Sequence, residues 1–187
     1  AEGHGDIQPP TDVARQRVLK NFDPIASWRP PLNGLEDADN AYPLHAITQR
    51  PMAMYHSWGS QNAWLRQIHT ANRLFMAREL VEEMGLKDDS WVYVTSPNGK
   101  IKAQIKAMEG VNPRTVWTWN AIGKRKGAWG LDKDAPEATK GFLLNHLISE
   151  LLPDGQGGHW PNADPVTGQA AWYDLRVKID PAPADTA

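Results

Sequence analysis

The segment WVYVTSPNGKIKAQI, residues 91–105, constrains the fold more than any other part of this sequence. Asn98-Gly99 supplies the positive φ angles that a tight hairpin turn needs, and the runs on both sides are short and rich in β-branched and aromatic residues. In the second run apolar residues alternate with Lys and Gln, which predicts a strand with one face in water. The first run, 91–95, is apolar on both faces and predicts a central strand.

Short strands recur along the chain, at 43–48, 115–119 and 171–179, separated by long loops. Such a pattern favours a closed β-barrel, because closure removes the exposed edges of short strands. The predicted fold class is therefore mainly β with helical insertions.

Helices are predicted at a few places only. The stretch from Asn72 to Met84 has apolar residues at a spacing of three to four, with Asn72 placed as the N-cap and Gly85 just beyond the end. A shorter helix is predicted from Thr11 to Lys20, and a helix or helical turn within 141–152.

The length of 187 residues, 41% of them hydrophobic, suits one ordinary core. Prolines crowd residues 1–41, which predicts an N-terminal arm or linker. Residues 42–179 form the predicted barrel domain, and 180–187 a disordered tail.

Composition excludes several classes of function. The net charge of −2, with both signs scattered, argues against binding of nucleic acid or anionic lipid. The absence of cysteine removes disulfides, thiolate metal sites and iron–sulfur ligation, and the histidines show no metal-ligand spacing, so no metal site is expected in this chain. No apolar run approaches the roughly 18 residues of a membrane span, which predicts a soluble chain without membrane insertion. No familiar catalytic motif is present, and no catalytic residue is assigned.

Hydrogen-bonding side chains follow the predicted strand 43–48 within fifteen positions. Such a concentration suits a large polar ligand held by many directed contacts. A solvated loop whose side chains cap nearby turns has the same composition, so residue types alone leave both interpretations open. The side chains are those of Thr48, Gln49, Arg50, His56, Ser57, Ser60, Gln61 and Asn62.

The order of these residues adds a resemblance. TQRPMAMYHSWGSQNAWL, residues 48–65, resembles the motif that opens the molybdopterin-dinucleotide-binding domain of the dimethyl sulfoxide reductase superfamily, commonly Thr-Gly-Arg followed by His and small polar residues. Further pieces follow in the family's order: YPL at 42–44, the segment after Asn72, GLKDDSWVYVTSPNGKIKAQI, NHL at 145–147 and DPVTGQAAWYDLRVKI at 164–179. Gln49 departs from the family's glycine, and Asp89-Ser90 from its usual Gly-Asp.

The resemblance implies a six-stranded double-psi β-barrel, the C-terminal domain of a catalytic subunit. This domain would cover one side of a molybdenum (or tungsten) bis(molybdopterin guanine dinucleotide) cofactor and would be inactive alone. The metal ligand, any iron–sulfur clusters and most of the substrate pocket would lie in preceding domains. An iron–sulfur electron-transfer subunit and a membrane anchor subunit are the implied partners, with the compartment, cytoplasm or periplasm, left open.

By the same resemblance, the residues at Trp117, Trp119 and Asn120 come near the substrate funnel, with packing beneath the barrel as the alternative. The basic cluster at 124–126 would attract an anionic substrate or form a solvated loop tip. Arg50 is the strongest candidate for phosphate oxygens. The implied cofactor contacts are Thr48, Gln49, Arg50, His56, Ser57, Asn145 and Tyr173.

Two other classes remain as alternatives: a stand-alone double-psi barrel whose tryptophan-rich loops bind a partner, and a small single-domain enzyme such as a decarboxylase or hydrolase. Within the superfamily, WTWNAIGKRKGAW at 117–129 and the segment 164–175 are similar to large subunits of the sulfite dehydrogenase and polysulfide or thiosulfate reductase types. This similarity predicts a sulfur oxyanion as the small substrate; a phenylacetyl-CoA oxidoreductase is the other branch.

Overall fold

A computed structural model of the chain describes residues 9–30, 41–59, 62–120, 122, 132, 140–170 and 175–183. The chain forms two compact units. One comprises residues 1–36 and 149–172, and the other comprises residues 37–148 and 173–187.

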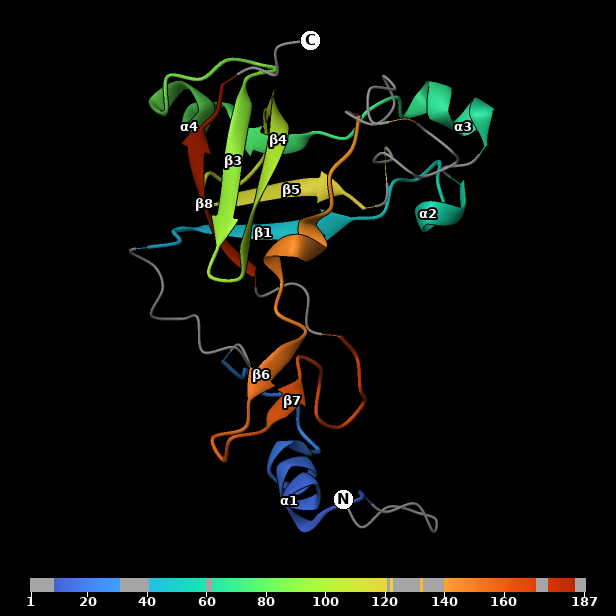
Figure 1. The fold of residues 1–187 in the computed structure, drawn as a ribbon, viewed down its shortest axis with the longest axis vertical. Coiled ribbons are helices and arrows are strands. Elements are labelled where there is room, and N and C mark those ends of the chain that lie inside the picture. Colours follow the sequence, from blue (N-terminus) through green and yellow to red (C-terminus); the bar gives the residue numbers. More distant parts are fainter. Residues whose placement is uncertain are drawn as a thin grey trace. The chain divides into compact units, whose positions relative to one another are not determined.

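The second unit is a closed barrel of six strands in the order β1-β5-β2-β4-β3-β8 (Figure 1). This barrel confirms the predicted fold class. The strands are β1 (Leu44–Gln49), β2 (Leu74–Ala77), β3 (Trp91–Ser96), β4 (Gly99–Met108), β5 (Thr115–Trp119) and β8 (Leu175–Pro181).

Strand direction decides which loops meet. β5 is parallel to β1, with Ile47 opposite Trp117, and β4 is parallel to β2. β1 and β3 are both antiparallel to β8, and β2 is antiparallel to β5. It follows that β1 and β5 finish side by side at one end of the barrel, and β2 begins next to them, since Leu74 is opposite Thr118. We call this the site end.

The core fills the barrel through alternating side chains. Along β4 the buried residues are Ile101, Ala103, Ile105 and Ala107, which confirms the predicted alternation. β3 is a central strand, as predicted, because it pairs with β4 on one side and with β8 on the other, and its buried residues also alternate. Its outer rings are covered by amphipathic lysines: Lys100 Nζ lies 3.8 Å from the ring centroid of Tyr93.

Only the second half of the helix predicted from Asn72 to Met84 is helical. Residues 74–77 form strand β2, and the helix α4 covers only Arg78–Glu83. Leu74 and Met76 are fully buried inside the barrel, so pairing with β4 and β5 outweighs the helical spacing of the apolar residues. Gly85 does end the helix with a φ of 65°.

In the described residues this unit also contains three short helices: α2 (His56–Gly59), α3 (Ala63–Ile68) and the 3-10 helix η4 (Leu144–Leu147). η4 is the helical turn predicted within 141–152. The predicted last strand 171–179 corresponds to β8, which runs to Pro181, while 171–174 lie outside the described residues. None of the helices in the described part of the chain has the length and apolar character to cross a membrane.

The first unit contains α1 (Asp12–Asn21) and a hairpin of β6 (Leu151–Pro153) and β7 (His159–Pro161). Thr11 caps α1, since its side-chain oxygen accepts from the Ala14 backbone amide at 3.1 Å. Residues 149–172, which the sequence places in the barrel domain, belong to this unit. The predicted division into arm, barrel domain and tail stays a prediction.

Candidate functional site

The ends of β1 and β5 lie side by side at the site end. In the register of these strands Thr48 is opposite Thr118, and Gln49 is opposite Trp119. Just beyond, the Asn120 amide donates to the Gln49 carbonyl at 2.9 Å. The structure therefore joins Thr48 and Gln49, from the first motif, to Asn120, which lies 71 positions after Gln49 in the sequence.

Two polar atoms at these strand ends are buried without a partner. Among the described residues, Thr48 Oγ1 and Asn120 Oδ1 are the buried side-chain oxygens that make no hydrogen bond. Leaving one such group unpaired costs about 1–3 kcal/mol, so native proteins seldom do so without a functional reason. A hydroxyl and an amide oxygen at one end of the barrel point to a ligand that carries hydrogen-bond donors.

Asn72 holds this arrangement in place and is itself buried. Its Nδ2 donates to the Trp119 carbonyl at 2.8 Å, and its Oδ1 accepts from Thr118 Oγ1 at 2.9 Å. The backbone N–H of Asn72 donates to the Lys140 backbone carbonyl at 2.7 Å. The sequence assigned Asn72 to a helix cap; its role as a cross-strand positioning residue depends on partners some 46 positions away, which no local pattern reveals.

The loop after β1 carries Arg50 and His56. The Arg50 guanidinium carbon lies 5.9 Å from the Tyr55 ring centroid, and the Tyr55 and His56 rings meet edge to face at 5.2 Å. His56 begins α2 with a φ of 47°, a left-handed conformation that costs a residue with a side chain roughly 1–2 kcal/mol. Strain of this kind collects at ligand sites, where the surrounding structure enforces it.

Other polar residues of the motif have different roles. Asn62 caps α3, since its Oδ1 accepts from the Trp64 amide at 2.9 Å, so the turn-capping alternative holds for this residue. Ser57 belongs to α2, and the structure does not place its side chain. Ser60 and Gln61 lie outside the described residues.

Asn145 lies in η4, which packs against the β3–β4 hairpin. Ser96 Oγ donates to the Leu147 carbonyl at 2.6 Å, and Asn98 Nδ2 donates to the same carbonyl at 3.3 Å. These bonds hold η4 against the end of β3, and the cofactor contact expected for Asn145 stays a prediction. Tyr173 and the basic cluster at 124–126 fall outside the described residues, so their predicted roles stay predictions.

Trp117 and Trp119 lie on the outer face of β5, because Val116 and Thr118 point into the barrel. Trp117 stacks on Phe75, with centroids 4.0 Å apart, and meets Trp119 edge to face at 4.8 Å. The two tryptophans thus pack against neighbours on the outside of the sheet. The substrate-side role of Trp119 and Asn120 remains a prediction.

Comparison with known proteins gives this geometry a family. A profile described as "Molydopterin dinucleotide binding domain" matches residues 44–158. The chain belongs to this family. The matched range contains the ends of β1 and β5, Asn72, α2 and η4.

Several relatives are much longer than this chain. It is 53% identical over 185 residues to a sulfite dehydrogenase subunit of Allochromatium vinosum, covering 98% of this chain and 19% of that protein. Dopamine dehydroxylase of Eggerthella lenta is 25% identical over 142 residues, which cover 72% of this chain and 13% of that protein. The structure of acetylene hydratase from Pelobacter acetylenicus shares the fold, with a TM-score of 0.62 and 16% identity over 88% of this chain and 22% of that one. The chain spans about a fifth or less of the length of the sulfite dehydrogenase and dopamine dehydroxylase proteins.

The side chains at the site end fit the molybdopterin dinucleotide cofactor. A pterin ring carries N–H groups that could donate hydrogen bonds to the unpartnered Thr48 Oγ1 and Asn120 Oδ1. The guanidinium group of the exposed Arg50 suits phosphate oxygens. Gln49 lies within the extended strand β1, so its replacement of the family's glycine requires no left-handed backbone. Asp89, in the turn before β3, has a φ of 64°, the left-handed conformation that glycine favours.

A metal site in this chain has no support from the described residues, which contain no cluster of three or more His, Asp or Glu side chains that would hold an ion.

Proposed function

We propose that this chain holds one side of a molybdenum or tungsten bis(molybdopterin guanine dinucleotide) cofactor at the site end of the barrel. The observation that carries the proposal is the pair of buried, unpartnered oxygens, Thr48 Oγ1 and Asn120 Oδ1. A ligand that donates hydrogen bonds to both would remove a cost of about 1–3 kcal/mol at each. The family of the chain supports a pterin as that ligand.

Each residue has a separate part in the proposed site. Thr48 and Asn120 bind a polar ring edge, and Asn72 positions them by holding the end of β5. Arg50 pairs with phosphate through its planar fork of donors. The remaining proposed contacts are Gln49, His56, Ser57, Asn145 and Tyr173.

The redox chemistry belongs to the longer protein. When bound, the cofactor supplies oxygen-atom transfer or coupled electron and proton transfer at its metal. This chain orients the pterin, excludes water from one side and sets the local electrostatics. The 53% identity to a sulfite dehydrogenase subunit supports a sulfur oxyanion as the substrate.

Other parts of that longer protein complete the assembly. We assign the metal ligand and any iron–sulfur clusters to its remaining domains, since this chain has no cysteine. The relative from Allochromatium vinosum is named as one subunit of its enzyme, which supports a complex of several chains. In that complex an iron–sulfur electron-transfer protein and a membrane anchor are the proposed partners.

The test is the Arg50→Ala substitution in the full-length protein, followed by extraction and quantification of bound pterin dinucleotide. Loss of a charge-assisted hydrogen bond worth about 1.5–3 kcal/mol should weaken binding roughly 10- to 100-fold and lower occupancy. Arg78→Ala is the matched control, because Arg78 lies in α4 after the end of β2, away from the site end, and pairs with Glu109. Wild-type occupancy in the Arg50→Ala protein would remove Arg50 from the binding role.

A further inference from the structure

The segment that follows the first cofactor residues exposes large apolar side chains. Residues 51–65 contain no Asp, Glu, Lys or Arg. Trp58 is 79% exposed and Trp64 is 77% exposed. We call the α2–α3 surface the set of exposed apolar residues in and beside these two helices: Met52, Tyr55, Trp58, Trp64 and Ile68.

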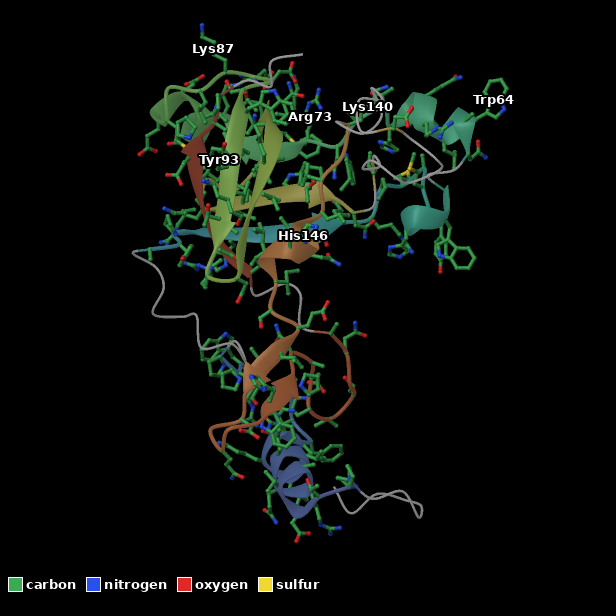
Figure 2. The ribbon with its side chains drawn as sticks, in the orientation of Figure 1. Trp64, Arg73, Lys87, Tyr93, Lys140 and His146 are labelled. Carbon is green, nitrogen blue, oxygen red and sulfur yellow. The ribbon has the colours of Figure 1, made fainter. Side chains whose placement is uncertain are left out.

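The α2–α3 surface is a built surface rather than a loose loop. Met54 is buried, and a Cβ atom at Gly59 would lie 3.3 Å from both the Met54 Cα and the Leu65 Cδ1, so the two helices pack closely there. Asn62 fixes the start of α3. Figure 2 shows Trp64 projecting from α3 away from the barrel. The fold thus buries Met54 and leaves Tyr55, Trp58 and Trp64 exposed, and large aromatic side chains are the type that anchors protein interfaces.

The position of the α2–α3 surface indicates what covers it. Tyr55 belongs to this surface and also contacts Arg50 and His56, so the surface is continuous with the proposed cofactor contacts. A domain that supplies one wall of a ligand site must meet the opposite wall, and the meeting line excludes water from the ligand.

We infer that the α2–α3 surface docks onto the remaining domains of the longer polypeptide and seals the rim of the cofactor site. The inference rests on the proposed function only in treating this chain as one part of a longer polypeptide. This chain covers 19% of the length of the sulfite dehydrogenase subunit, which supports that view. A second copy of this chain fits the position less well, because it would supply the same side of the cofactor site and not the opposite side. In the described residues that same side offers no cluster of metal ligands.

Two methionines of the same unit give the test an internal control. In the chain by itself Met52 is 102% exposed and Met108 is 41% exposed. Met108 ends β4 opposite Ala77, the last residue of β2, and β2 begins at the site end, so Met108 lies away from that end. An open α2–α3 surface therefore predicts faster oxidation of Met52 than of Met108, and a docked surface predicts the reverse.

The experiment is hydroxyl-radical footprinting of the full-length, cofactor-loaded protein, read by mass spectrometry of the peptides and repeated over a range of protein concentrations. We expect Met52 to be oxidised several-fold more slowly than Met108, with Trp58 and Trp64 protected to a similar degree at every concentration. Faster oxidation of Met52 than of Met108 would overturn the inference. Protection that appears only at high concentration would also overturn it, because it would assign the α2–α3 surface to a second copy.

Cofactor content, measured on the same samples, separates this inference from the proposed function. Loaded protein with an open α2–α3 surface contradicts the docking and leaves cofactor binding intact. Protein that is protected at Met52 but never contains pterin dinucleotide supports the docking and contradicts the proposed function.

Discussion

The Thr118 hydroxyl donates to the Asn72 side-chain oxygen at 2.9 Å, a buried bond that joins the segment just before β2 to the end of β5. Asn72 completes the tie by donating to the Trp119 carbonyl at 2.8 Å. Asn120 follows directly, and its amide bonds the end of β1. The buried side-chain amide of Asn72 thus positions the two strand ends that carry the unpartnered oxygens.

Replacing Asn72 with alanine should therefore destabilise the barrel by roughly 2–3 kcal/mol, because the Thr118 hydroxyl and the Trp119 carbonyl lose a buried partner. Urea unfolding followed by tryptophan fluorescence measures this change. Asn112→Ala is the matched control, since the exposed Asn112 side chain accepts only from the Arg114 amide in a surface turn and its loss should cost less than about 1 kcal/mol. Equal effects of the two substitutions would contradict the role of Asn72.

Local signals predicted the parts of the fold that local physics decides. The β3–β4 hairpin was predicted correctly, but the reason was wrong: neither Asn98 nor Gly99 has a positive φ, and the two turn residues are Pro97 and Asn98, since Ser96 pairs with Gly99. Residues 74–77 were predicted as helix because their apolar spacing suits a helix, and only their pairing with β4 and β5 makes them a strand. The closed barrel followed from the shortness of the strands, but their order was not readable from the chain.

The candidate site divides in the same way. Thr48 and Arg50 were found through the order of residues in one segment. The tie made by Asn72 and the burial of Asn120 Oδ1 arise only when β2 and β5 meet, so residue type and spacing carry no sign of either.

Gly99 is the close-approach glycine of the fold. A Cβ atom there would collide with the His146 carbonyl oxygen of η4, which is backbone and has little room to move. Gly99→Ala should destabilise the protein by about 1–3 kcal/mol and displace η4, the helix that carries Asn145. The midpoint of urea unfolding tests the first effect.

Gly110→Ala provides the comparison for Gly99. Gly110 has a φ of 72° and open space around it, so alanine there costs only the conformational strain of roughly 1–2 kcal/mol and leaves η4 in place. The two variants should therefore differ in pterin content, which should fall for Gly99→Ala alone. A fall in both, or in neither, would argue against the role assigned to η4.

Asp88 should contribute to stability in a pH-dependent way. The hydrogen bond from Lys106, with Nζ 2.6 Å from Oδ2, and a further bond from the Ala107 amide hold the pKa of Asp88 below its usual value of 3.8. A carboxyl group with a lowered pKa in the folded state stabilises the fold fully above pH 3.8 and loses that contribution as the pH falls through the lower value.

Asp88→Asn should accordingly lower stability near pH 7 and flatten the decline between about pH 4 and pH 2, as measured by unfolding midpoints across that range. Asp180→Asn is the control, because Asp180 meets Lys178 in an exposed pair at 3.5 Å, of a kind that contributes little. A decline as steep in Asp88→Asn as in the wild type would show that other groups govern the acid sensitivity.

The most direct test of the central claim is the pterin dinucleotide content of a Thr48→Val variant of the full-length protein. Valine keeps the shape of threonine and removes only the unpartnered hydroxyl. The matched substitution is Thr118→Val on the paired strand, which removes a hydroxyl that is already satisfied by Asn72 and should reduce stability instead. We predict that Thr48→Val raises the unfolding free energy of the cofactor-free protein, because it removes the unpaired buried hydroxyl, and yet loses much of its bound pterin dinucleotide. Wild-type cofactor content in Thr48→Val would contradict the claim that the site end holds the pterin.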